Sequence, residues 1–176
     1  MDATQSAHVA RVRQLRESFA AANERLVARL RRASDEAAER RAPEAWSAAQ
    51  IGWHVATVST RFAAMIAGDV TGPQPLPESF QERPWDDIAA SVPERLQAPR
   101  VAHPPTAVTR REAVAALEAS GTKMASAFDA LTQERAGGMG ITHAVVGTIN
   151  LYQLAAWATA HIARHNKQAK RILGEG

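Results

Sequence analysis

The chain of 176 residues contains no cysteine. This absence excludes disulfide bonds, thiolate metal ligands and a cysteine nucleophile, and it is compatible with a reducing compartment. The sequence also has no run of about 18 apolar residues, which a membrane-spanning helix would require. Its first residues, Met1 to Gln5, lack the charged and then apolar pattern of a signal peptide. We therefore expect a soluble cytoplasmic protein with no membrane partner.

Aromatic residues are scarce as well, at 5% of the chain, and neither sign of charge dominates. The net charge is +3, and much of the excess arginine falls between residues 11 and 32, where Glu17 and Glu24 interrupt it. Aromatic side chains do not alternate with these arginines, as they would on a surface that stacks single-stranded nucleic acid. The pattern favours a solvated helix face, and we do not expect a nucleic-acid partner.

Hydrophobic residues make up 45% of the chain, and alanine, which has the highest helix propensity, is abundant. At this length a single domain spanning residues 1–176 is the simplest organisation. Four long stretches repeat apolar residues at steps of three and four, the spacing typical of helices that pack in near-antiparallel bundles. The sequence therefore predicts an all-α protein built on four long helices.

The boundaries of these helices follow from local signals. The first is expected from about Ser6 to Ala33, and the second should end near Gly68. Each of the last three begins with a capping box, in which one side chain caps the first turn and a Glu or Gln three residues later reaches back. The three pairs are Ser47 with Gln50, Thr109 with Glu112, and Asn150 with Gln153.

The connection between the second and third helices, residues 68–108, holds eight of the nine prolines. A connection of this length is unusual in a compact domain. Its apolar residues, among them Trp85 and Ile88, are too many for a free linker. We expect a crossover that packs along the helices and contains a short helix at about Asp86 to Leu96. Between the third and fourth helices the sequence predicts a glycine-rich loop.

Two histidines, His161 and His165, lie one turn apart on the inward stripe of the fourth helix. Imidazoles at i and i+4 project from one face with Cβ atoms about 5–6 Å apart, which suits two ligands of one metal ion. A ring that packs inward needs a hydrogen-bond or metal partner. The whole stripe reads Leu151, Leu154, Ala158, His161, His165, Gln168 and Ile172. Metal binding is the first hypothesis for this face.

His54 is the third candidate ligand, because it lies on the inward stripe of the second helix, three residues after Ile51 and four before Val58. Three imidazoles could hold one divalent ion and leave positions open for water or substrate, as catalytic zinc sites do. The alternative is a set of three core histidines that bond to neighbouring groups. Their shared inward placement favours the metal site.

Two segments resemble the DinB-like (DinB/YfiT) superfamily of metal-dependent bacterial proteins. Residues 45–55, Ala-Trp-Ser-Ala-Ala-Gln-Ile-Gly-Trp-His-Val, are similar to the family's Trp-Ser-x-x-(Glu/Gln)-x-x-x-His motif. The second segment runs from His143 to the fourth helix, where His161-Ile-Ala-Arg-His165-Asn-Lys-Gln168 is similar to the family's His-x-x-x-His-x-x-Gln ending. One departure is Ala144, where many relatives have proline after the histidine. The resemblance covers nearly the whole chain and implies an up-up-down-down four-helix bundle with a long proline-rich crossover between helices 2 and 3.

The resemblance also implies that His54, His161 and His165 bind one divalent metal ion, most often zinc or nickel, and that the chain forms homodimers. Family members resemble S-transferases that use a low-molecular-weight thiol as cosubstrate. We therefore expect a transferase acting on a small-molecule substrate, in which the metal activates the thiol in a pocket of the bundle. Two alternatives stay open: a metal-dependent hydrolase, and a non-catalytic stress protein that binds a metal or a small ligand.

Other residues are weaker candidates for the functional site, and none is a clear general base. Gln168 could orient a ligand or cap the end of the core, and His143 could support a ligand or be structural. His103 on the crossover could act as a base, although loop histidines are usually surface residues. Trp85 could line a pocket or anchor the crossover. We expect surface or packing roles for His8, Tyr152, Trp46 and Trp53, and a surface or dimer-interface role for Arg164.

Overall fold

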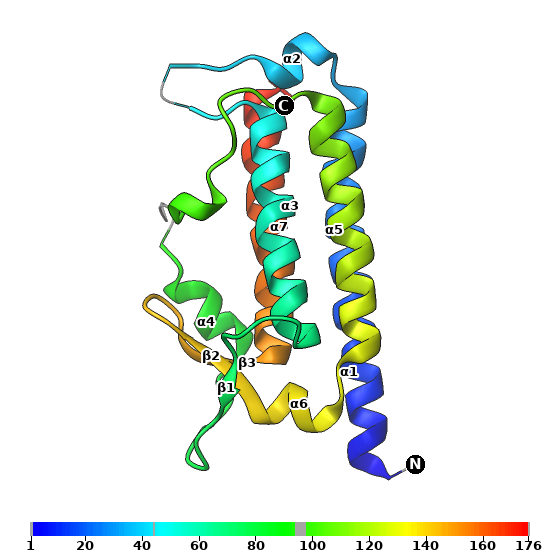
Figure 1. Ribbon diagram of the computed structural model, residues 1–176, viewed down its shortest axis with the longest axis vertical. Coiled ribbons are helices and arrows are strands. Elements are labelled where there is room, and N and C mark those ends of the chain that lie inside the picture. Colours follow the sequence, from blue (N-terminus) through cyan, green and yellow to red (C-terminus); the bar gives the residue numbers. More distant parts are fainter. Residues whose placement is uncertain (1, 44, 94–97, 176) are drawn as a thin grey trace.

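Helices make up most of the structure, and one small β-sheet lies near one end of them (Figure 1). The computed structural model describes residues 2–43, 45–93 and 98–175. Four long helices lie side by side: α1 (Ala3–Arg32), α3 (Ala48–Ala67), α5 (Arg110–Ala130) and α7 (Leu151–Ile172). The expected all-α class is thus confirmed for most of the chain, and the sheet is an addition to it.

The ends of the long helices are set by the side chains that the sequence indicated. All three capping boxes form, at Ser47, Thr109 and Asn150, so that orphan N–H groups of each first turn are satisfied. Gly68 ends α3 in the left-handed conformation, with φ of 93°, which favours glycine. Only α1 differs slightly, because Asp2 caps it and it begins at Ala3.

The core lies between the four helices, and the apolar stripes predicted for them supply it. The largest fully buried side chains include Leu26, Leu30, Ile51, Ile66, Leu117, Met124, Leu151 and Leu154. Helix α3 makes its most extensive contact with α5, and Gly52 permits that closeness. A Cβ at Gly52 would lie 2.7 Å from Leu30 Cδ1 and 3.3 Å from Ala113 Cβ.

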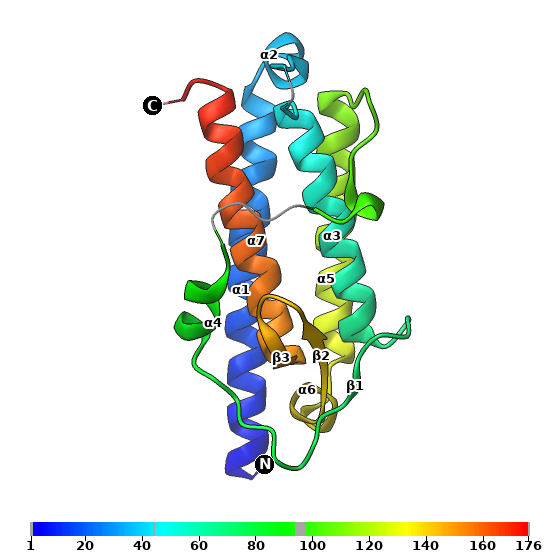
Figure 2. The same cartoon turned by 90° about the vertical axis from the view of Figure 1, so that its left-hand side faces the viewer.

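The directions of the helices correct one expectation. Helices α1 and α7 run one way and α3 and α5 the other, as both ribbon views show (Figures 1 and 2). The order along the chain is therefore up, down, down, up, and the expected up-up-down-down order is wrong. The reason lies in the connections: α1 has 30 residues, about 45 Å of helix. The short link after α1, which includes α2 (Asp35–Glu39), does not span that length, so α3 starts where α1 ends and runs back along it. The long crossover does span the length, so α5 starts at the same end as α3 and runs in the same direction.

The connection between α5 and α7 is not the glycine-rich loop that was expected. It contains α6 (Gln133–Gly138) and a hairpin of β2 (Met139–His143) and β3 (Gly147–Asn150). Strand β1 (Gln74–Pro75), from the crossover, pairs antiparallel with β2 and completes a sheet of order β1-β2-β3. These strands have two to five residues and include glycine and proline, so their sequence lacks a recognisable strand pattern.

The crossover carries α4 (Trp85–Ser91) and a 3₁₀ turn, η1 (Arg100–Ala102). The expected helix at Asp86 to Leu96 is thus confirmed for its first half but ends earlier, and Leu96 lies outside the described residues. Pro93 accounts for the early end, because the residue before a proline is disfavoured in the helical conformation. Ile88 is fully buried, so α4 anchors the crossover to the helices behind it.

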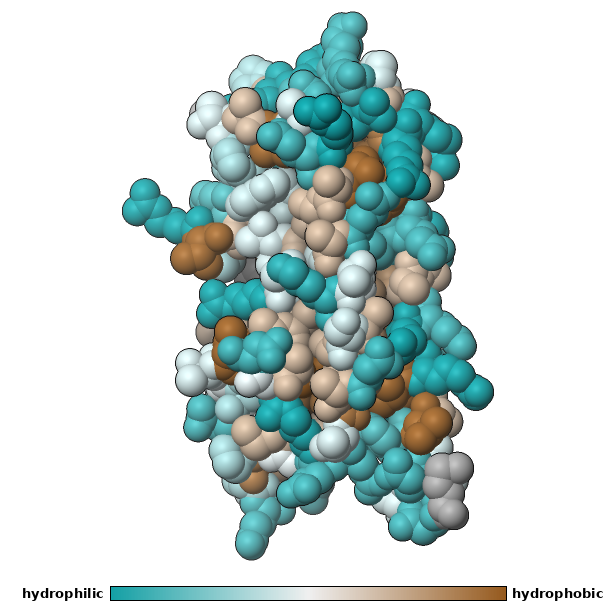
Figure 3. Space-filling view, turned by 45° about the vertical axis from the view of Figure 1, so that its right-hand side comes forward, coloured by the Kyte–Doolittle hydropathy of each residue, from teal (hydrophilic) through white to brown (hydrophobic). Residues whose placement is uncertain are grey.

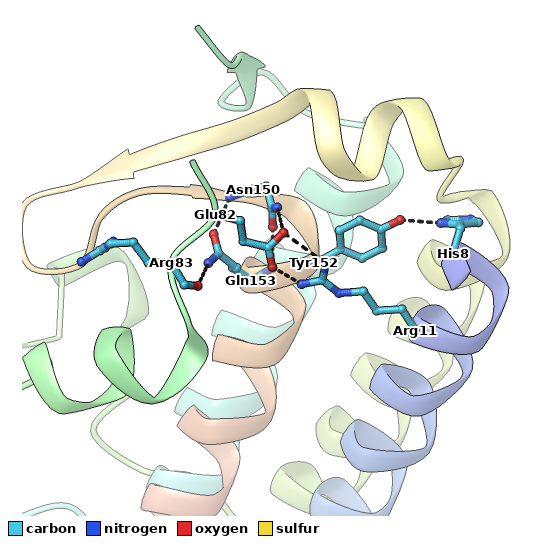
Figure 4. Close-up of polar contacts among 7 residues, drawn as sticks. All are labelled: His8, Arg11, Glu82, Arg83, Asn150, Tyr152 and Gln153. Carbon is cyan, nitrogen blue, oxygen red and sulfur yellow. Dashed lines mark hydrogen bonds and ion pairs between the residues drawn. The ribbon is translucent and has the colours of Figure 1, made fainter. Parts of the chain in front are cut away.

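Polar contacts fasten the first half of the crossover to α1 and α7 (Figure 4). The Glu82 carboxylate accepts hydrogen bonds from Arg11 on α1 and, at 2.8 Å, from Asn150 Nδ2. Gln153 Nε2 donates to the Arg83 carbonyl at 2.7 Å. The capping box of α7 is therefore also a docking point for the crossover.

His8 belongs to the same region, and this corrects the expectation of a surface residue. Its Nδ1 lies 2.7 Å from the hydroxyl of Tyr152, which is buried (Figure 4). The guanidinium carbon of Arg11 lies 4.0 Å from the centre of the Tyr152 ring. The packing role expected for Tyr152 is therefore joined by a hydrogen bond and a cation–π contact.

The described helices include none that is both long and apolar enough to cross a membrane. On the face shown in Figure 3, hydrophobic residues are scattered among hydrophilic ones. The large apolar side chains that are exposed come from separate elements: Val9, Val70, Val101 and Ile172.

Candidate metal centre

Three imidazoles converge between α3 and α7. One ring nitrogen from each of His54, His161 and His165 lies within 4.8 Å of the other two. The Nε2 atoms of His54 and His161 lie 3.2 Å apart. The structure therefore brings together the three histidines that the sequence singled out.

His54 is held by the crossover as well as by its own helix. It lies near the start of α3, is only 2% exposed, and its Nδ1 lies 2.7 Å from the carbonyl oxygen of Ala102. A carbonyl only accepts, so Nδ1 carries the proton and Nε2 holds a lone pair. Gln50 fixes this part of the crossover, since its Nε2 donates to the carbonyls of Pro105 and Thr106 at 2.8 and 3.0 Å.

His165 has an acceptor on its own helix. Its Nδ1 lies 2.9 Å from Gln168 Oε1, one turn further along α7. With the proton on Nδ1, the Nε2 lone pair of His165 is free for a metal ion. Of the two roles left open for Gln168, the orienting one matches this contact.

His161 differs from the other two histidines. Its Nδ1 is buried and has no hydrogen-bond partner among the described residues. Its Nε2 faces His54 Nε2 rather than an oxygen acceptor. The cluster is therefore asymmetric, with two rings oriented by oxygen atoms and one that lacks this support.

The electrostatic surroundings keep all three rings neutral at neutral pH. Burial lowers the pKa of His54; the bond to Ala102 opposes this effect and the nearby His103 adds to it. Burial, His165, His54 and Arg164 together hold the pKa of His161 well below its usual range. Burial and His54 lower the pKa of His165 to about 4. Neutral imidazoles are the form that binds metal ions.

This geometry fits a divalent ion. Two nitrogens bound at 2.0–2.1 Å to one tetrahedral zinc would lie about 3.3 Å apart, close to the separation of the His54 and His161 Nε2 atoms. Metal-bound histidines usually donate their second N–H to an oxygen acceptor, as His54 and His165 are placed to do. Imidazole ligands suit zinc and nickel, and they suit copper and iron as well.

The aromatic and cationic neighbours of the cluster have mainly structural contacts. The Trp46 ring centre lies 4.9 Å from that of His54 and 5.8 Å from that of His103. His103 is exposed, and its Nε2 lies 3.0 Å from the carbonyl of Ala98 on the same segment. Arg164 donates to the carbonyl of Pro93 at 3.0 Å, so it holds the crossover.

His143 and Trp85 also have packing roles. His143 meets Trp157 edge-on, with ring centres 4.8 Å apart, and its Nδ1 accepts the Val145 N–H at 3.2 Å. Trp85, at the start of α4, is partly buried against the core, as an anchor of the crossover would be. Neither residue belongs to the three-histidine cluster.

Two hollows lie away from the histidines. One, of about 510 Å³, is lined by charged residues of α1, α2 and α5, among them Arg31, Asp35 and Glu118. The other, of about 340 Å³, lies beside the small sheet, against Leu76 and Thr142. The substrate pocket expected at the histidines is therefore neither of these.

The low pKa of His165 predicts that the metal-free protein loses stability in acid. The unfolded chain binds a proton at this residue below about pH 6.5, whereas the folded protein does so only near pH 4. The contribution of neutral His165 to the free energy of unfolding is therefore complete above pH 6.5. It falls by on the order of 2–3 kcal/mol as the pH falls toward 4. Urea unfolding at pH 7 and pH 4.5 should show a smaller drop for His165→Gln than for the wild type. Equal drops would contradict the lowered pKa.

A family model described as the DinB superfamily matches residues 18–169. The match contains His54, His161 and His165 together with Gln168 and the whole crossover between α3 and α5. No curated protein matches the chain.

Proposed function

The chain belongs to the DinB superfamily, and on that premise we propose that it binds one divalent metal ion through His54, His161 and His165 and transfers a low-molecular-weight thiol to a small-molecule substrate. The observation that supports this most is the convergence of three neutral imidazoles, two of them oriented by oxygen acceptors. The identity of the metal as zinc or nickel stays a prediction, and so do the cytoplasmic location and the homodimer.

A bound divalent ion would supply Lewis acidity that lowers the pKa of a thiol or of water. The three histidines are neutral ligands, so they leave the charge of the ion uncompensated, which favours an anionic partner such as a thiolate. Ala102 and Gln168 would hold the rings of His54 and His165 in place by accepting their Nδ1–H groups. The chain has no cysteine, so the thiol must come from a cosubstrate.

One observation favours the non-catalytic alternative, a stress protein that binds a metal without turnover. The two hollows described above are lined by other residues than the three histidines. A substrate seated in either hollow would not touch the histidines, so a metal held by them would bind without catalysis.

Metal content tests the site. We expect about one equivalent of zinc or nickel in protein purified without a histidine tag, measured by elemental mass spectrometry, and less than about 0.1 equivalent in His161→Ala, because two imidazoles seldom hold a divalent ion tightly. His143→Ala is the matched control, since it removes a partly buried histidine outside the cluster. Metal-free wild type that also takes up no added divalent ion would show the histidines to be core residues.

Turnover then separates the two candidate functions. The metal-loaded wild type is mixed with a low-molecular-weight thiol and an electrophile, and conjugate formation is followed beside metal-free protein and His161→Ala. Conjugation that depends on both metal and His161 supports the transferase. A fully loaded protein with no conjugation across a panel of thiols favours metal binding without turnover.

A further inference from the structure

The positions of the ring protons in the histidine cluster follow from its hydrogen bonds. A neutral imidazole has one N–H and one lone pair, and the partner of one nitrogen decides the state of the other. The Ala102 carbonyl requires the proton of His54 on Nδ1, so that His54 Nε2 holds a lone pair. The amide oxygen of Gln168 requires the same arrangement in His165.

His161 has the opposite requirement. Its Nε2 lies 3.2 Å from the lone pair of His54 Nε2, and two lone pairs at that distance would repel each other. The pair is favourable when His161 Nε2 carries the proton and donates it to His54. The buried Nδ1 of His161 is then a bare acceptor, which agrees with its lack of a partner among the described residues. Buried donors without a partner are rarer than buried acceptors without one.

We infer that His161 is the tautomeric switch of the cluster: it holds its proton on Nε2 in the metal-free protein and on Nδ1 when the metal is bound, while His54 and His165 keep theirs on Nδ1. The inference rests on the proposed metal binding. One proton leaves Nε2 as that nitrogen becomes a ligand, and one proton is taken up from water at Nδ1, so the number of protons on the ring does not change.

The switch makes His161 the least firmly held of the three ligands. In the bound state its Nδ1–H is buried where the described structure offers no acceptor, whereas the other two rings donate to oxygen. An oxygen acceptor on the second nitrogen commonly changes metal affinity by 10–100-fold. Removal of the oxygen acceptor should therefore lower metal affinity at His165, whereas His161 has no such acceptor among the described residues.

The test is nitrogen NMR of the imidazole rings in ¹⁵N-labelled full-length protein at pH 7.5, without metal and with one equivalent of zinc. Bound zinc is measured separately by elemental analysis, and the signals of each ring are assigned by their loss in His54→Gln, His161→Gln and His165→Gln. We expect His161 to move from the Nε2–H to the Nδ1–H form on zinc addition, and His54 and His165 to remain Nδ1–H throughout.

His143 provides an internal control, because its Nδ1 accepts the Val145 N–H and its proton must stay on Nε2 with or without zinc. An Nδ1–H form of His161 in the metal-free protein would overturn the inference, and so would bound zinc with His161 still in the Nε2–H form. If elemental analysis shows no bound zinc, the metal-binding proposal fails and the switch fails with it. The metal-free tautomers would still show whether the hydrogen-bond assignment was right.

Discussion

Zinc is expected to raise the free energy of unfolding of the metal-free protein by about 4 kcal/mol when free zinc is 1,000 times its Kd, because it binds the folded histidine cluster and not the unfolded chain. For a chain of this length each kcal/mol moves Tm by about 2–4 °C, so Tm should rise by about 8–16 °C. Thermal unfolding followed by circular dichroism measures the shift.

Three variants make the result specific. His54→Ala should show no rise, since it removes one of the three ligands, and His143→Ala should show the full rise. Gln168→Met should need about 10–100-fold more zinc for the same rise, because His165 Nδ1 loses its acceptor. An equal rise in wild type and His54→Ala would place the stabilising zinc somewhere other than this cluster.

Gly52→Val is expected to lower the free energy of unfolding by about 3 kcal/mol, the upper part of the range for overpacked cores. The cause is the contact of α3 with α1 and α5, where even a Cβ would come within 2.7 Å of Leu30 Cδ1 and 3.3 Å of Ala113 Cβ. Both of those side chains are fully buried, so they have little room to move. Urea unfolding of the metal-free protein measures the loss.

The control for this variant is Gly137→Val, because a Cβ at Gly137 meets no atom within 4 Å. Its stability should stay within about 0.5 kcal/mol of the wild type. If Gly52→Val is as stable as this control, the close approach of α3 is not what requires glycine there. Gly52 lies two residues before His54, so a displaced α3 should also weaken zinc binding.

Local signals in the sequence determined the long helices and much of the cluster. Capping boxes act within four residues, and apolar stripes act within a few turns of one helix, so the starts at Ser47, Thr109 and Asn150 could be predicted without the rest of the chain. The inward placement of His54, His161 and His165 followed from the same periodicity and favoured a common metal site, and the family resemblance implied the same site.

Only the tertiary structure decided the features that depend on distant segments. The order of helix directions depends on what each connection can span, and the sheet forms because β1 meets a hairpin more than sixty residues later. The acceptor of His54 is the backbone carbonyl of Ala102. Every residue has a backbone carbonyl, so the sequence does not indicate which one His54 contacts. The asymmetry of His161 arises likewise from the surroundings of one buried nitrogen. Patterns within single helices thus placed the three candidate ligands. Contacts between distant segments decided which of their ring N–H groups have an oxygen acceptor.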